Sequence, residues 1–184
     1  DADIRTVMKT LFLSDFFKKA RGKRVKCPAE FIAGTIKLTG EFREIVPGLP
    51  TLDAASIVMG QKLMDPPTVE GWHTGKEWID GGTLTERINF ATARVGNPEM
   101  PGTRAIIDRL SGSGDPITPA ELVDGVLDLA GPIEVADETR TALLQLAELD
   151  GDLEFGSSSD RTKSEDRIAR TLALAVASRE YQFA

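Results

Sequence analysis

Apolar side chains recur every three or four positions through most of this chain, which is the spacing of amphipathic α-helices. No stretch alternates apolar and polar residues convincingly, as a half-buried strand would. We therefore predict an all-α fold, an irregular bundle of seven to eight helices with one long loop. The predicted helices span about residues 3–17 (restarting at Ser14), 28–39, 51–63, 83–95, 104–110, 119–129, 136–149 and 165–181.

Three of these helices begin with a capping-box pattern, in which the first and fourth residues satisfy each other's backbone N–H groups. The patterns start at Cys27, Thr83 and Thr118. Proline follows Cys27 and Thr118 directly, where its missing N–H costs nothing. Asp3 is the predicted cap of the first helix.

The length of the chain suits a single helical domain, residues 1–184. A sub-boundary is placed near residues 96–102, and the Gly/Ser/Asp-rich segment 150–164 is interpreted as flexible. The last helix is expected to pack back onto the first half of the chain.

The predicted loop 65–82 is the most unusual segment, because it contains a Pro-Pro pair and both tryptophans. Loops of this length are uncommon inside compact domains and are often functional. Two interpretations stay open. Both indoles fill the helical core, or one indole face stays exposed and stacks on a ligand or partner. The ligand or partner positions in and around the loop are Gln61, Pro66, Pro67, Trp72, His73, Trp78, Arg87 and Asn89.

The net charge of −7 argues against general nucleic-acid binding, which needs a basic surface. No apolar run is long enough to span a bilayer. The charge is uneven, however, since residues 97–160 contain fourteen acidic and three basic residues. A basic patch precedes them, formed by Lys18, Lys19, Arg21, Lys23, Arg24 and Lys26. This patch is either a solvated turn facing the acidic half or a surface that docks on an anionic polymer, lipid or partner.

Few catalytic or metal-binding constellations are available. Cys27 and His73 are the only cysteine and histidine, so we expect no zinc site, no other metal and no cofactor. The acidic run from Asp150 fails the calcium-loop pattern at its sixth and twelfth positions. A Cys27–His73 dyad is formally open, but Cys27 fits better as a serine-like helix cap. Whether the chain is an enzyme stays uncertain.

Several motifs together resemble the bacterial domain-of-unknown-function family numbered 1800 (DUF1800). The long motif comprises Met59-Gly60-Gln61, Pro66-Pro67, Val69, Gly71-Trp72, Gly75, Trp78-Ile79, Thr83-Leu84, Arg87 and Asn89-Phe90-Ala91. The flanks Lys26–Phe31 and Ala177–Gln182 resemble the segments on either side of it. Two residues depart from the family pattern, His73 for proline and Cys27 for serine.

The resemblance implies a mainly helical fold and a chain that is the C-terminal part of a longer, commonly exported protein. It therefore implies an extracytoplasmic setting, periplasmic or secreted. Our first hypothesis is a structural or interaction module that packs on a missing N-terminal part of the same protein, or binds an extracytoplasmic protein or polymer. The alternative is part of an extracytoplasmic enzyme acting on a polymer or carbohydrate, with the loop 65–82 lining its site.

Overall fold

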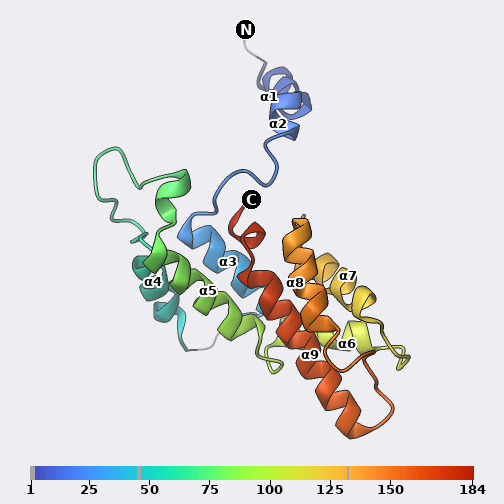
Figure 1. The fold of residues 1–184 in the computed structure, drawn as a ribbon. Helices are drawn as coiled ribbons and strands as arrows, with labels where there is room; N and C mark the ends of the chain where they lie inside the picture. Colours follow the sequence, from blue (N-terminus) through green and yellow to red (C-terminus); the bar gives the residue numbers. More distant parts are fainter. Residues whose placement is uncertain (1–2, 45–46, 132) are drawn as a thin grey trace.

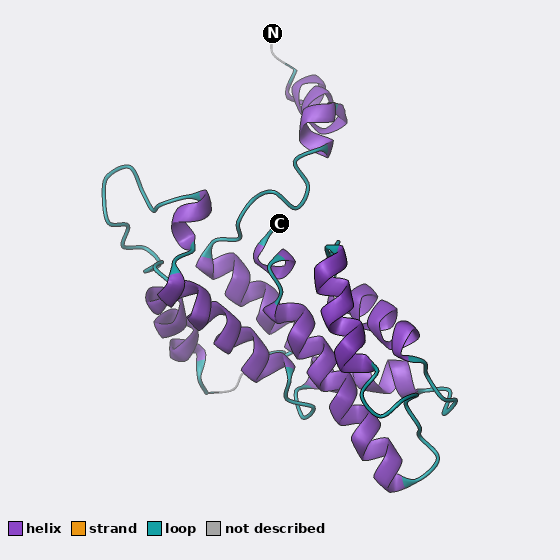
Figure 2. Ribbon diagram, in the orientation of Figure 1, coloured by secondary structure: helices purple, strands orange, loops and turns teal. Residues whose placement is uncertain are grey.

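The computed structural model describes residues 3–44, 47–131 and 133–184, and these form nine α-helices, two short 3₁₀ helices and no strand (Figures 1 and 2). The α-helices are α1 (Ile4–Leu13), α2 (Asp15–Lys18), α3 (Pro28–Thr39), α4 (Leu49–Val58), α5 (Gly81–Val95), α6 (Pro101–Ser111), α7 (Pro119–Ala130), α8 (Asp137–Ala147) and α9 (Ser158–Ala177). The 3₁₀ helices are η1 (Gly75–Trp78) and η2 (Glu180–Gln182). The prediction of an all-α bundle is confirmed.

The long C-terminal helix α9 lies at the centre of the bundle, against α5, α6, α7 and α8 (Figure 1). Its fully buried residues include Ile168, Leu172 and Val176, which repeat at the spacing of one helix face. The predicted packing of the last helix onto the first half of the chain is confirmed through α5, which in turn packs on α3.

Helix α6 crosses α3 at a point where only glycine fits. A Cβ atom added to Gly102 would lie 1.9 Å from the backbone oxygen of Leu38. The hydroxyl of the neighbouring Thr103 donates a 3.0 Å hydrogen bond to the backbone oxygen of Val95. The segment 96–102, where we placed a sub-boundary, thus runs into a buried contact between α6 and α3.

The predicted helix starts are partly right. At α7 the Thr118 capping box forms as predicted, and Asp3 caps α1. Cys27 is the N-cap of α3, but its side chain makes no capping hydrogen bond. The predicted start of α5 at Thr83 was wrong, because the Asp80 side chain accepts hydrogen bonds from the amides of Gly82 and Thr83 and starts the helix at Gly81.

Other boundaries also differ from the prediction: α4 ends at Val58 and not near residue 63, and α6 begins at Pro101 and not at residue 104. Helix α4 begins at Leu49, with Pro50 inside its first turn. Helix α9 begins at Ser158, seven residues before the predicted Glu165, because the Ser157 side chain accepts from the amide of Asp160. The segment interpreted as flexible also contains the buried Leu153, whose amide and carbonyl pair with those of Ile117.

Candidate functional site

Arg87 of α5 is the most deeply buried of the predicted site residues, with 0% exposure. Its Nε donates a 2.9 Å hydrogen bond to Oε1 of Gln182, and its Nη2 donates a 2.6 Å bond to the backbone oxygen of Lys26. The guanidinium also lies over the ring of Phe31, 4.6 Å from its centroid. Burial lowers the pKa of Arg87 to about 10. We call this set the Arg87 junction, and it joins α5, α3 and the C-terminal segment.

Gln61 connects α4 and α3 next to the Arg87 junction. Its Oε1 accepts a 2.9 Å hydrogen bond from the amide of Ala29, in the first turn of α3. The backbone oxygen of Gln61 accepts a 2.6 Å bond from the hydroxyl of Ser56 in α4. A side chain from the loop thus supplies the helix cap that the Cys27 thiol does not, and it ties α4 to α3.

The two tryptophans of the loop have different surroundings. Trp78, at the end of η1, is buried. Trp72 is half-buried, and its Nε1 donates a 3.1 Å bond to the backbone oxygen of Lys62. Neither indole lines the cavity between residues 21–26 and 179–184 or the cavity beside Arg167. Trp78 therefore follows the core interpretation, and Trp72 mainly closes its own loop.

The remaining predicted positions, three in the loop and Asn89 on α5, are exposed. The three in the loop are Pro66, Pro67 and His73, and His73 lies 3.3 Å from the carboxylate of Glu77 on the next turn. The eight predicted positions thus comprise three buried residues, the half-buried Trp72 and four exposed residues. They do not converge on one site.

The predicted basic patch is also divided. Arg24 pairs with Glu30, and Arg21 pairs with Glu134 at 3.3 Å. Lys26 donates a 2.9 Å bond to the backbone oxygen of Tyr181, and burial lowers its pKa. Lys18 and Lys19 lie at the end of the separate helical arm described next, and Lys23 lies on the turn that follows.

Sequence reasoning missed the largest exposed apolar surface. Helices α1 and α2 form an arm that projects from the bundle (Figure 1), and none of its apolar side chains belongs to the buried core cluster. Phe16 and Ile4 are each 77% exposed. The exposed apolar residues of the arm are Ile4, Val7, Met8, Leu11, Phe12, Leu13, Phe16 and Phe17. The amphipathic pattern identified this helix correctly, but the pattern does not say whether the apolar face packs on the core.

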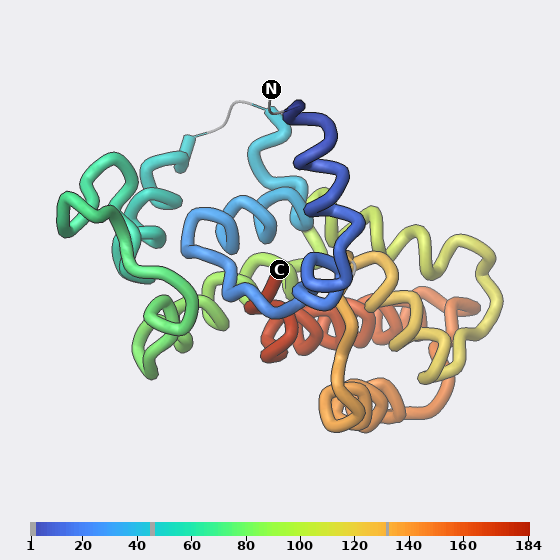
Figure 3. The backbone as a smooth tube through the Cα atoms, turned by 90° about the horizontal axis from the view of Figure 1, so that it is seen from above, coloured from blue at the N-terminus to red at the C-terminus, as the bar shows by residue number. Residues whose placement is uncertain are grey.

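A second group of exposed apolar residues lies on α4 and the loop that follows it. The members are Leu49, Ile57, Val58, Leu63, Met64 and Val69. Met64 is 94% exposed and has a φ of 64°, a conformation that costs an L-residue about 1 kcal/mol or more. In the view from above, the loop lies at one edge of the molecule, and α6 and α7 lie at the opposite edge (Figure 3).

The described residues contain no cluster of three or more histidine, cysteine, aspartate or glutamate side chains able to hold a metal ion. Among the helices in the same part of the chain, none combines the length and apolar character that crossing a bilayer requires.

One comparison with known proteins is informative. The family described as "Protein of unknown function (DUF1800)" matches residues 1–183. No curated protein and no solved structure gives a significant match. Among the residues on which the family resemblance rests, Gln61 and Arg87 are buried and hydrogen-bond to other segments, and Met59, Trp78, Phe90 and Ala91 are also buried. Because the match covers nearly the whole chain, this protein belongs to the DUF1800 family.

Proposed function

We propose that this protein is a helical interaction module. Its N-terminal third supplies an apolar docking surface to which another polypeptide binds. The observation that carries the proposal is the uneven distribution of exposed apolar side chains. Of the fifteen large hydrophobic residues exposed in the described chain, fourteen lie between Ile4 and Val69, and only Leu149 lies beyond. Exposed apolar surface gathered in this way marks interaction sites in soluble proteins.

The arm contributes more exposed apolar side chains to the docking surface than α4 and the loop that follows it. Burying a side chain such as Phe16 or Leu13 contributes about 1.5–3 kcal/mol to association. The arm also lacks internal support, since α1 and α2 together contain fourteen residues and touch mainly each other. Helices of this length are marginal in water on their own. A partner that covers the apolar face would therefore stabilise the arm as well as bind it.

The charge of the arm favours an acidic rim on the partner. The arm and the turn that follows it, residues 3–24, contain seven basic and two acidic side chains, a net charge of +5. Two of the seven, Arg21 and Arg24, pair with glutamates outside this segment. Residues 25–184 contain fifteen basic and twenty-six acidic side chains, a net charge of −11. Opposite charge around an apolar contact speeds and orients docking. We infer a partner surface with an apolar groove and carboxylates at its edge.

The family resemblance supports one source for this partner, namely an N-terminal part of the same longer protein. We carry over the setting from the same resemblance and propose an extracytoplasmic, bacterial location. An open pocket lined by both indoles and at least two carboxylates would favour the enzyme alternative. Trp78 is buried and Trp72 lines neither described cavity, so no observation favours that alternative.

Hydrogen exchange of the arm tests the proposal. In the isolated 184-residue chain, the amides of residues 4–18 are expected to exchange nearly as fast as in an unfolded peptide. In the assembled native protein, the same amides are expected to exchange at least ~100-fold more slowly, because a partner covers them.

A matched pair of variants sharpens the test. Phe12→Ser with Phe16→Ser is expected to abolish this protection, whereas Leu149→Ser, an exposed apolar residue outside the docking surface, is expected to leave it intact. Equal exchange of the arm in the isolated and assembled forms would remove the proposal's support.

A further inference from the structure

A cavity of about 790 Å³ lies at the base of the arm, where three segments meet. The segments are the turn 21–26, the connection between α7 and α8, and the C-terminal residues 179–184. Cavities of roughly 300–1,000 Å³ are typical of small-molecule sites. This cavity is therefore large enough for a ligand, and it is separate from the apolar face of the arm.

Basic side chains predominate around the cavity. Arg21, Lys23, Lys26 and Arg179 line it, against Glu134, Glu180 and, in the 184-residue chain, the terminal carboxylate of Ala184. Both glutamates already have partners within the chain. Glu134 pairs with Arg21 at 3.3 Å, and Glu180 accepts from the amide of Ala136 and the hydroxyl of Thr139 at 3.3 and 3.1 Å.

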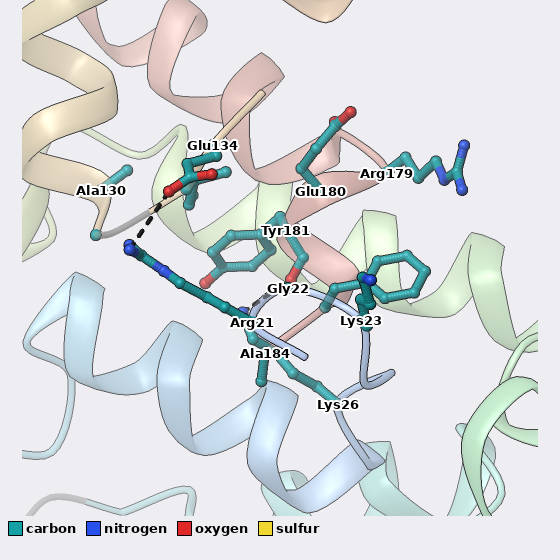
Figure 4. A pocket seen from close by; sticks show the side chains of 13 residues that line it. Arg21, Gly22, Lys23, Lys26, Ala130, Glu134, Arg179, Glu180, Tyr181 and Ala184 are labelled. Carbon is teal, nitrogen blue, oxygen red and sulfur yellow. Dashed lines mark hydrogen bonds and ion pairs between the residues drawn. The ribbon is translucent and has the colours of Figure 1, made fainter. Parts of the chain in front are cut away.

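Two of the cationic side chains are not neutralised by a carboxylate within the described residues. Within the described residues, neither Lys23 nor Arg179 forms an ion pair. Figure 4 shows both on one side of Tyr181, while the Arg21–Glu134 pair lies on the other side. Lys26 donates to the backbone oxygen of Tyr181, and its ammonium group has further N–H donors to offer. The cavity therefore presents unpaired positive charge at one side.

The lining also contains aromatic surface. The ring of Tyr181 is held firmly. Its hydroxyl lies 3.1 Å from the Thr35 hydroxyl, it packs edge-to-face with Phe31, and the Lys26 ammonium group lies 4.4 Å from its centroid. Phe183 lines the same cavity, with the Arg179 guanidinium 5.9 Å from its ring centroid. Rigid aromatic rings beside charged donors suit a ligand with a flat apolar body and an anionic group.

We propose that this cavity binds a small amphipathic anion, a carboxylate or phosphate group carried on an aromatic body. The anion lies near Lys23 and Arg179, and the body packs against Phe183, which is more exposed than the buried Tyr181. Because the cavity is bounded by both the base of the arm and the bundle, an occupied cavity also fixes the turn 21–26 against the C-terminal segment.

Titration of the 184-residue chain with phenyl phosphate, followed by calorimetry and by amide chemical shifts, tests this proposal. We expect saturable binding that weakens as salt rises, with shift changes centred on residues 21–26, 130–134 and 179–184. Phenol and inorganic phosphate are each expected to bind more weakly, because each supplies one half of the ligand. Benzoate in place of phenyl phosphate distinguishes a carboxylate from a phosphate preference.

Charge-removing variants provide the control. Lys23→Gln with Arg179→Gln is expected to raise the dissociation constant roughly tenfold. Lys37→Gln with Arg109→Gln removes the same charge from exposed positions outside the cavity and is expected to change it little. All four positions are exposed, so both variants are expected to fold.

Absence of saturation up to ~10 mM phenyl phosphate would overturn the proposal, since sites of this size bind fragments more tightly. Equal weakening in both double variants would also overturn it, because the effect would then follow net charge alone. The arm variant Phe12→Ser with Phe16→Ser is expected to bind phenyl phosphate normally, since neither residue lines the cavity. The cavity and the docking surface are thus tested separately.

Discussion

Arg87 and Gln182 lie 95 positions apart in the sequence, and the Nε of Arg87 donates a 2.9 Å hydrogen bond to Oε1 of Gln182. The same guanidinium reaches the backbone oxygen of Lys26, so one buried side chain holds the entry to α3 against the end of the chain. Arg87→Leu is expected to lower the free energy of unfolding by about 3 kcal/mol, because both buried acceptors lose their donor. Arg87→Lys is expected to cost about 2 kcal/mol, since an ammonium group lacks the fork that reaches both acceptors.

Urea unfolding monitored by circular dichroism measures these changes. Arg109→Leu on the exposed face of α6 serves as the control and is expected to stay within about 0.5 kcal/mol of the native chain. Arg87→Leu behaving like this control would show that the junction does not stabilise the fold.

Gly102 and Gly34 form a matched pair for testing the contact between α6 and α3. A Cβ at Gly102 would meet the backbone of Leu38 at 1.9 Å, whereas a Cβ at Gly34, within α3, meets nothing within 4 Å. Gly102→Ala is expected to destabilise the fold by about 3 kcal/mol or more, because helix backbones must separate. Gly34→Ala is expected to stabilise it by about 0.5–1 kcal/mol through helix propensity. Thermal unfolding of both variants checks the signs, and a neutral Gly102→Ala would rule out the close crossing.

The cap that Gln61 provides for α3 predicts another measurable effect. Gln61→Ala is expected to cost about 1 kcal/mol, since the amide of Ala29 loses its partner. Cys27→Ala is expected to change stability by less than about 0.5 kcal/mol, because the thiol makes no capping hydrogen bond. Denaturant midpoints of the two variants should therefore differ clearly, and the reverse order would contradict the capping assignment.

How much of this arrangement the sequence predicted depends on the range of the interactions. Thr118 and Asp3 were identified as caps because their partners lie within three residues. The function of Gln61 could not be predicted, because its partner Ala29 lies 32 residues away. The start of α5 was misplaced because Asp80 and Thr83 are both good caps, and local pattern alone does not rank them. The amphipathic pattern of α1 predicted a helix, but the same pattern describes a face packed on the core and a face presented to a partner.

Glu30 gives a pH dependence with a definite sign. The hydrogen bond from Arg24 is the largest cause that lowers the pKa of Glu30 below its usual value of 4.5. A carboxylate with a lower pKa in the folded state binds fewer protons than in the unfolded state, so its contribution is complete above pH 4.5. That contribution is lost as the pH falls through the folded pKa. The stability difference between the native chain and Glu30→Gln is expected to be under about 1 kcal/mol at pH 7, because the pair is largely exposed.

Urea midpoints at pH 7 and pH 3 check this dependence. The difference between the two proteins is expected to shrink at the lower pH. A difference that grows on acidification would contradict the assigned pair of Arg24 with Glu30.

Site-specific photo-cross-linking tests the docking surface most directly. Benzoylphenylalanine replaces either Phe16 or Leu149 in the native protein, expressed in its own cells. Phe16 lies on the arm and is 77% exposed, whereas Leu149 is 56% exposed and lies outside the proposed docking surface. The docking account predicts that position 16 cross-links in high yield to one defined polypeptide segment, either of the same longer protein or of a partner, and that position 149 does not. Cross-linking at position 16 no stronger than at position 149 would contradict it.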